Sequence, residues 1–159
     1  MTNNDTFVQM SAALTGISAD VLAPAVTNFD LATTYYESAE KKYPNDFPTL
    51  LSKYDSLITD GKTPEEAIQT IQDDSLLGPM ARQINFLWYM GAWAVETAFG
   101  VQTRNLSVIT YQKGMVWQVM QSHPMGYSVS RYGYWGAQPG TLEQYVGSES
   151  GNKKGGQKW

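Results

Sequence analysis

The residues with the clearest potential for catalysis are one histidine and two pairs of acids. His123 is the only histidine of the chain, and the acids are adjacent at Glu65/Glu66 and Asp73/Asp74. A histidine beside a carboxylate can perform general acid–base chemistry, and two carboxylates are the usual requirement of a glycoside hydrolase. The residue types therefore leave open a small hydrolase that uses Asp or Glu with His123.

Each of these residues also has a structural interpretation, which we favour. Thr63 followed by Pro64 and Glu66 forms the pattern of a capping box, so Glu65 and Glu66 stand in a first helical turn, where negative charge is stabilised. His123 follows the last predicted helix, and an imidazolium at a helix C-terminus is stabilised by the helix dipole. We therefore predict no catalytic residue in this chain.

The composition excludes several classes of cofactor and partner. The absence of cysteine excludes disulfides, thiolate zinc sites, iron–sulfur ligation and covalent haem attachment within this chain. Haem held by His123 and Met125 would require two residues of one loop to reach opposite faces of the porphyrin. The sequence contains no G-x-G-x-x-G, P-loop or G-x-S-x-G motif, so no cofactor is expected here. The net charge of −4, without a basic stripe, argues against nucleic acid.

The hydropathy pattern predicts no membrane helix, and either the protein is made without a signal peptide or its signal has been removed from this numbering. The longest apolar stretch, INFLWYMGAWAV from Ile84, is shorter than the roughly 20 residues of a membrane span and predicts a buried helix. The N-terminal MTNNDTFVQM has neither the basic nor the apolar region of a signal peptide.

Helical periodicity and capping residues predict an all-α fold, a compact bundle of five to six helices over residues 1–122. No strand-like alternation competes with it. The predicted helices begin at Asn4 or Asp5 and end before Gly16, run from Ser18 toward Tyr43, from Asn45 to Gly61, from Thr63, over residues 76–93, and over residues 105–120. We expect Trp88, Trp93 and Trp117 to be core residues of these helices.

The C-terminal part is predicted to be irregular, because HPMGYSVSRYGYWGAQPG, residues 123–140, mixes aromatic residues with glycine and proline. We interpret residues 123–146 as an arm of the same domain and residues 147–159 as a flexible or partner-docked tail. Aromatic residues are enriched at the energetic centres of interfaces. The predicted partner interface therefore consists of Tyr127, Tyr132, Tyr134, Trp135, Pro139 and Trp159. Stacking of these aromatics on sugar, in a free-standing carbohydrate-binding module, is the alternative.

Four segments in order, FVQMSAALTG, ARQINFLWYMGAW, YQKGMVWQVM and PMGYSVSRYGYWGAQP, resemble a known family. Between Phe7 and Pro139 the chain resembles the small subunit of bacterial membrane-bound FAD-dependent sugar and polyol dehydrogenases, such as those acting on sorbitol, fructose, glucose and gluconate. The markers are Trp88-Tyr89-x-Gly91, the spacing of Tyr111 and Trp117, and Gly133-Tyr134-Trp135 with Pro139.

The resemblance implies a non-catalytic subunit that supports folding, flavin loading, stability and export of a large catalytic subunit of the GMC type. FAD is then expected in that large subunit, and an iron–sulfur cluster and c-type haem in partner subunits, including a multihaem cytochrome c. The family's twin-arginine export signal is missing from this sequence. The expected location is the periplasm, with attachment to the inner membrane only through the complex.

Overall fold

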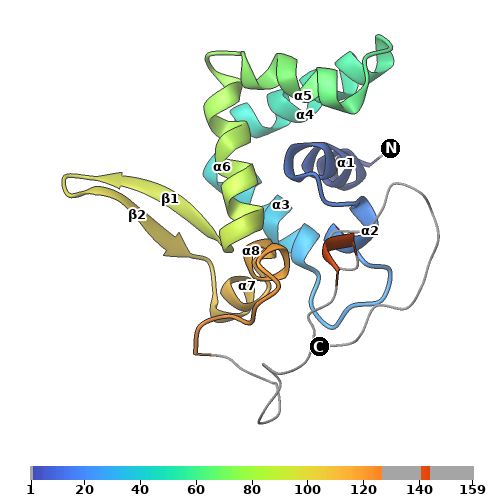
Figure 1. The fold of residues 1–159 in the computed structure, drawn as a ribbon. Helices are drawn as coiled ribbons and strands as arrows, with labels where there is room; N and C mark the ends of the chain where they lie inside the picture. Colours follow the sequence, from blue (N-terminus) through green and yellow to red (C-terminus); the bar gives the residue numbers. More distant parts are fainter. Residues whose placement is uncertain (1, 127–140, 144–159) are drawn as a thin grey trace.

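A computed structural model describes residues 2–126 and 141–143. The described part is largely all-α, as predicted, with one two-stranded sheet in addition (Figure 1). Its elements are α1 (Asn3–Thr15), α2 (Ala19–Leu22), α3 (Leu31–Lys42), α4 (Asp46–Thr59), α5 (Pro64–Gln72), α6 (Leu77–Met90), β1 (Ala92–Thr97), β2 (Gly100–Asn105), α7 (Val108–Gln112) and α8 (Met115–Val119).

The capping box predicted at the start of α5 is confirmed. The Thr63 hydroxyl accepts a hydrogen bond from the Glu66 amide at 3.2 Å, and the Glu66 carboxylate accepts one from the Thr63 amide at 2.9 Å. The first helix ends before Gly16 as predicted, but it is capped by Thr2 rather than by Asn4 or Asp5. Asp5 is instead the third residue of that helix, and its carboxylate completes a capping box with Thr2.

The single helix predicted from Ser18 toward Tyr43 is wrong, because the structure contains two helices there. Only α2 follows Ser18, and residues 23–30 are not helical. Pro24 explains the break, since it lacks an amide donor and disfavours helical backbone at the residue before it. Asp30 then caps α3, with its carboxylate accepting a hydrogen bond from the Thr33 amide at 2.9 Å.

The prediction of no strands is also wrong. The helix expected over residues 76–93 ends at Met90, because Gly91 adopts a left-handed conformation with φ of 64°. The chain then forms the antiparallel hairpin β1–β2, in which Trp93 pairs with Arg104 and Thr97 with Gly100. The last predicted helix, over residues 105–120, is divided into α7 and α8.

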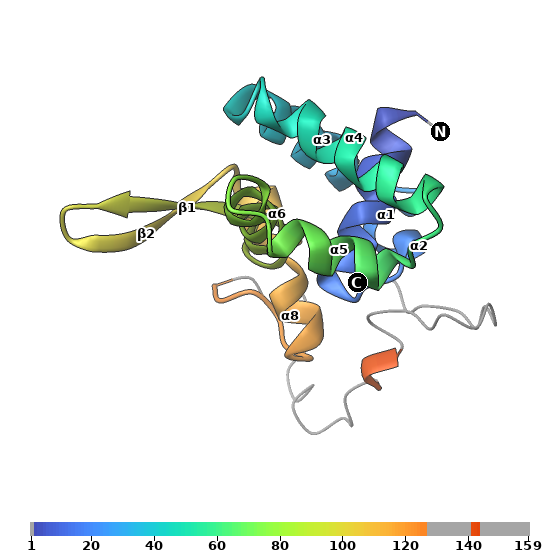
Figure 2. The ribbon, with the colours of Figure 1, turned by 90° about the horizontal axis from the view of Figure 1, so that it is seen from above.

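The core lies around α1 and α6, and α1 packs against α2, α3, α4, α5 and α6 (Figure 2). Its centre is aromatic: the ring of Phe7 stacks on Trp88 at 6.0 Å, and Tyr35 meets Trp88 edge to face at 4.8 Å. Phe47 adds an edge contact to Phe7. The core prediction is confirmed for Trp88 and for Trp93, although Trp93 reaches the core from a strand.

Candidate partner interface

The paired acids predicted as possible catalysts stabilise helix ends. Glu66 belongs to the capping box of α5. The Asp73 carboxylate accepts a hydrogen bond from the side-chain amide of Gln69 at 3.1 Å. Asp74 accepts hydrogen bonds from the backbone amides of Leu76 at 2.8 Å and Leu77 at 2.9 Å. The Leu77 and Leu76 amides hold the pKa of the Asp74 carboxyl below its ordinary value. Glu66 therefore has a defined structural partner at the start of α5, and Asp73 and Asp74 have theirs at the junction of α5 and α6.

His123 is not brought to these acids. It follows α8, whose N-terminal Gly114 lies against Tyr89 and Met90 at the C-terminal end of α6, whereas α5 joins the other end of α6 (Figure 1). The Nδ1 atom of His123 lies 3.0 Å from the Pro124 carbonyl oxygen. Within residues 2–126 and 141–143, no three residues of the His, Cys, Asp and Glu types gather at a spacing suited to a metal ion.

The predicted interface residues Tyr127, Tyr132, Tyr134, Trp135, Pro139 and Trp159 lie outside the described residues. The described segment that leads into them is residues 92–126. This segment begins with the hairpin that the sequence analysis missed.

The base of the hairpin is fixed by Gly91 and Thr110. The Gly91 carbonyl accepts hydrogen bonds from the Thr110 hydroxyl at 3.0 Å and from the Leu106 amide at 3.2 Å. A Cβ atom at Gly91 would overlap the Thr110 carbonyl group, so the close approach requires glycine. Thr110 is fully buried and also completes the N-terminal cap of α7 with Ser107. Gly91 before the hairpin and Leu106 after it are thus linked by a hydrogen bond beside the buried Thr110.

Trp93 attaches the proximal part of β1 to α3. Its indole Nε1 donates a hydrogen bond to the Ser38 hydroxyl at 3.0 Å, and its ring meets Tyr43 edge to face at 5.9 Å. The Lys42 ammonium lies 4.2 Å from the centroid of the Trp93 ring, a cation–π arrangement. The hairpin therefore leaves the helical domain from a well-anchored base.

The distal half of the hairpin projects away from the helices, and in neither view does a described helix lie beside it (Figures 1 and 2). Every residue of β2 is exposed. At the tip, Phe99 is 93% exposed, and the turn is braced by the Thr97 hydroxyl, which donates to the Gly100 carbonyl at 2.7 Å and accepts from the Phe99 amide at 3.2 Å. A large aromatic side chain is thus presented to solvent on a defined turn.

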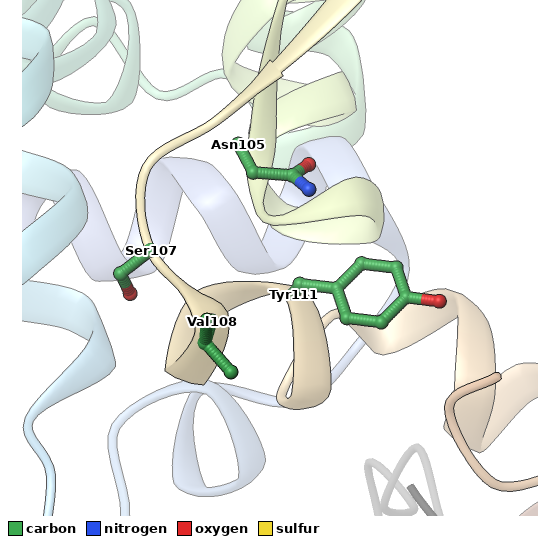
Figure 3. Close-up of a pocket in the computed structure, with 4 residues that line it drawn as sticks. All are labelled: Asn105, Ser107, Val108 and Tyr111. Atoms are coloured by element: carbon green, nitrogen blue, oxygen red, sulfur yellow. The ribbon is translucent and has the colours of Figure 1, made fainter. Parts of the chain in front are cut away.

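Below the hairpin, an open pocket of about 410 Å³ lies between β2 and α7. Its lining residues are Asn105, Ser107, Val108 and Tyr111, whose side chains are drawn in Figure 3. None of these four is an acid, a histidine or a lysine, and Asn105, Ser107 and Tyr111 offer neutral hydrogen-bonding groups. Beside it, the Trp117 indole donates to the Tyr111 carbonyl at 2.7 Å. Trp117, predicted as core, is only half-buried.

Exposed apolar side chains are concentrated in this part of the molecule. Of the twelve large apolar residues exposed within the described part of the chain, four lie elsewhere, at Val26, Ile58, Leu76 and Leu142. The other eight form what we call the apolar end: Val95, Phe99, Val101, Val108, Ile109, Val119, Met120 and Met125. The sequence carried a weak signal for it, since Trp93, Val95 and Thr97 alternate before the turn at Gly100.

The fold and the apolar end define a small helical domain that presents apolar surface next to a projecting hairpin. A family model described as membrane bound FAD containing D-sorbitol dehydrogenase matches residues 1–139. The chain belongs to this family, and the match confirms the resemblance drawn from the sequence. No match was found among curated proteins. None of the helices in the described ranges combines the length and apolar character needed to cross a bilayer.

Proposed function

We propose that this chain is the non-catalytic small subunit of an FAD-dependent sugar or polyol dehydrogenase complex, bound to a large catalytic subunit that holds the FAD. The observation that carries the proposal is the apolar end, exposed on a member of an FAD-containing dehydrogenase family. Exposed apolar side chains gathered in one part of a chain mark a candidate interaction site, because monomeric proteins rarely leave large apolar patches in water.

The residues that could have supported independent catalysis favour the same interpretation. Glu66 and Asp74 are engaged with backbone amides at helix ends, and His123 lies near the opposite end of α6 from them. Their arrangement offers no paired carboxylates facing a common cavity. The chemistry of the complex is therefore assigned to the partner subunit.

The finer roles follow from the family. In this proposal the small subunit supports folding, flavin loading and stability of the large subunit and accompanies it through twin-arginine export to the periplasm. The complex is attached to the inner membrane through its other subunits, among them a multihaem cytochrome c that receives the electrons. The residues from Tyr127 to Trp159 named above extend the interface beyond the apolar end.

The test is expression of the large FAD-containing subunit of the same organism with and without this chain. We expect soluble, flavin-loaded dehydrogenase only when both are present, and no flavin absorbance in the isolated chain. A large subunit that is equally soluble, flavin-loaded and active alone would contradict the proposal, as would sugar binding or turnover by the isolated chain.

A variant of the C-terminal segment tests the extended interface. Trp135→Ala should weaken binding to the large subunit by about 2 kcal/mol if this residue is an anchor. Unchanged binding of the variant would remove Trp135 from the interface.

A further inference from the structure

We propose that the distal half of the hairpin is a docking arm that inserts, with Phe99 leading, into an apolar recess of the large FAD-containing subunit. The inference rests on the proposed function and adds the element and the manner of contact. We define the docking arm as residues 94–103, the part of β1 and β2 beyond the Trp93 anchor.

The register of the hairpin shows that each face of the docking arm carries an exposed apolar side chain that a partner could bury. Val95 pairs with Gln102 and Val101 pairs with Glu96, and directly paired residues of an antiparallel ladder share a face. Because adjacent pairs point to opposite faces, Val95 lies on one face and Val101 on the other. Both are exposed, Val101 at 69%. An occupant that lies flat on one face would bury only one of them, whereas a recess that receives the docking arm covers both.

The tip is organised for insertion. Phe99 is almost fully exposed, yet the Thr97 hydroxyl fixes its backbone through the bonds to the Phe99 amide and the Gly100 carbonyl. A side chain held on a defined turn loses little conformational entropy on binding. An isolated two-stranded hairpin is at best marginally stable in water, so contact with another protein would also stabilise the docking arm itself.

The size of the docking arm indicates that it is one part of a larger contact. Its four residues of each strand are about 13 Å long, and a hairpin about 10 Å wide then has roughly 130 Å² on each face. Both faces together fall below the roughly 800 Å² that each partner buries in a standard interface. An interface formed only by the docking arms of two copies of this chain would therefore be too small to hold a stable dimer. On one partner, the docking arm can be supplemented by the exposed Val108 and Ile109 of α7, the helix that lies next to β2.

The charge of the docking arm favours a protein recess over a lipid surface. Its only ionisable side chain is Glu96, which is negative. Segments that bind anionic lipid headgroups carry lysine or arginine. Insertion into hydrocarbon would bury Glu96 and Gln102 without partners, whereas a protein recess can offer polar groups to both side chains.

A shortened hairpin gives the sharpest test. Replacing residues 96–101 by Asn-Gly joins Val95 to Gln102 through a two-residue turn. The change removes two residues from each strand, so the pairing type and the Trp93 anchor are kept. The full chain is co-expressed with the large subunit, and the dissociation constant is measured on purified proteins. We expect at least a thirtyfold weaker complex for the shortened hairpin and about thirtyfold for Phe99→Ala.

Val26→Ala is the matched control, because Val26 is also 93% exposed but lies in the loop between α2 and α3. Its affinity should equal that of the wild type. Circular dichroism and the melting temperature confirm that each variant is folded. A wild-type chain that forms no complex overturns the proposed function, and this inference with it. A wild-type complex that the shortened hairpin forms equally well overturns this inference alone.

A photo-crosslinking residue at position 99 distinguishes the occupants. Cross-links to the large subunit support the proposal. Cross-links between two copies of this chain in the complex would overturn it. So would binding of the isolated chain to phosphatidylethanolamine/phosphatidylglycerol vesicles that Phe99→Ala abolishes.

Discussion

The hydroxyl of Thr110 donates a 3.0 Å hydrogen bond to the carbonyl of Gly91, and this contact closes the segment that contains the hairpin. The same hydroxyl accepts a hydrogen bond from the backbone amide of Ser107 at 2.9 Å and so caps α7. One buried side chain thus sets both the direction in which β1 leaves α6 and the start of the next helix. Changes at either residue should affect the hairpin before they affect the helical core.

Gly91→Ala should be strongly destabilising, by about 3 kcal/mol. The substitution combines a left-handed backbone conformation with overlap of the new Cβ and the Thr110 carbonyl. Gly61→Ala is the control, because Gly61 also has a positive φ but open space around it, and it should lose only about 1 kcal/mol. Urea denaturation measures the free energy of unfolding of both variants. Equal losses would show that the close approach of Gly91 to Thr110 adds nothing to the destabilisation.

Thr110→Val should lower the free energy of unfolding by about 2 kcal/mol. The variant keeps the shape of the side chain but leaves the buried Gly91 carbonyl without its hydroxyl donor. Thr110→Ser keeps the hydroxyl and should retain most of the stability. Hydrogen exchange adds a local readout, since the Leu106 amide, which bonds to Gly91, should exchange faster in the valine variant. Unchanged exchange there would contradict the role assigned to Thr110.

Local signals in the sequence were sufficient for α5 but not for the hairpin. The capping box of Thr63 and Glu66 spans four residues, and each partner is visible in the sequence. The turn at Gly91 depends instead on a contact with Thr110, nineteen residues later. A sequence pattern cannot show such a contact, and Trp88 to Val95 fits both a buried helix and a strand.

The interface predicted in the C-terminal arm stays a prediction, and the sequence did not indicate the apolar end. Aromatic residues among glycines indicated a protein interface, and the family match agrees with a subunit of a dehydrogenase complex. The apolar residues of the hairpin gave no comparable signal, because Val95 and Val101 are unremarkable until the fold leaves them exposed. Exposure is a property of the tertiary structure, and of these two residues only Val95 lay in a stretch predicted to be buried, INFLWYMGAWAV.

Lys42→Ala should lower the free energy of unfolding by about 0.5–1 kcal/mol, the usual range for an exposed cation–π contact. The ammonium lies 4.2 Å from the Trp93 ring centroid and 5.2 Å from that of Tyr43. Lys42→Arg should retain the contact, and Lys41→Ala, at the neighbouring exposed position, serves as the control. Tryptophan fluorescence during thermal unfolding follows the effect, and equal stability of the two alanine variants would contradict it.

The junction of α5 and α6 should lose stability in acid. The Leu77 and Leu76 amides lower the pKa of Asp74 in the folded chain, so its contribution to stability is fully present above the unfolded value, about 3.9. That contribution is lost as the pH falls through the lower folded-state pKa. Asp74→Asn keeps an acceptor oxygen but cannot titrate, so its melting temperature should fall less steeply between neutral pH and about pH 3. Asp60→Asn, which removes another exposed carboxylate at the end of α4, is the matched control. If the melting temperatures of wild type and Asp74→Asn fell equally steeply with pH, the two amides would not stabilise the ionised carboxylate.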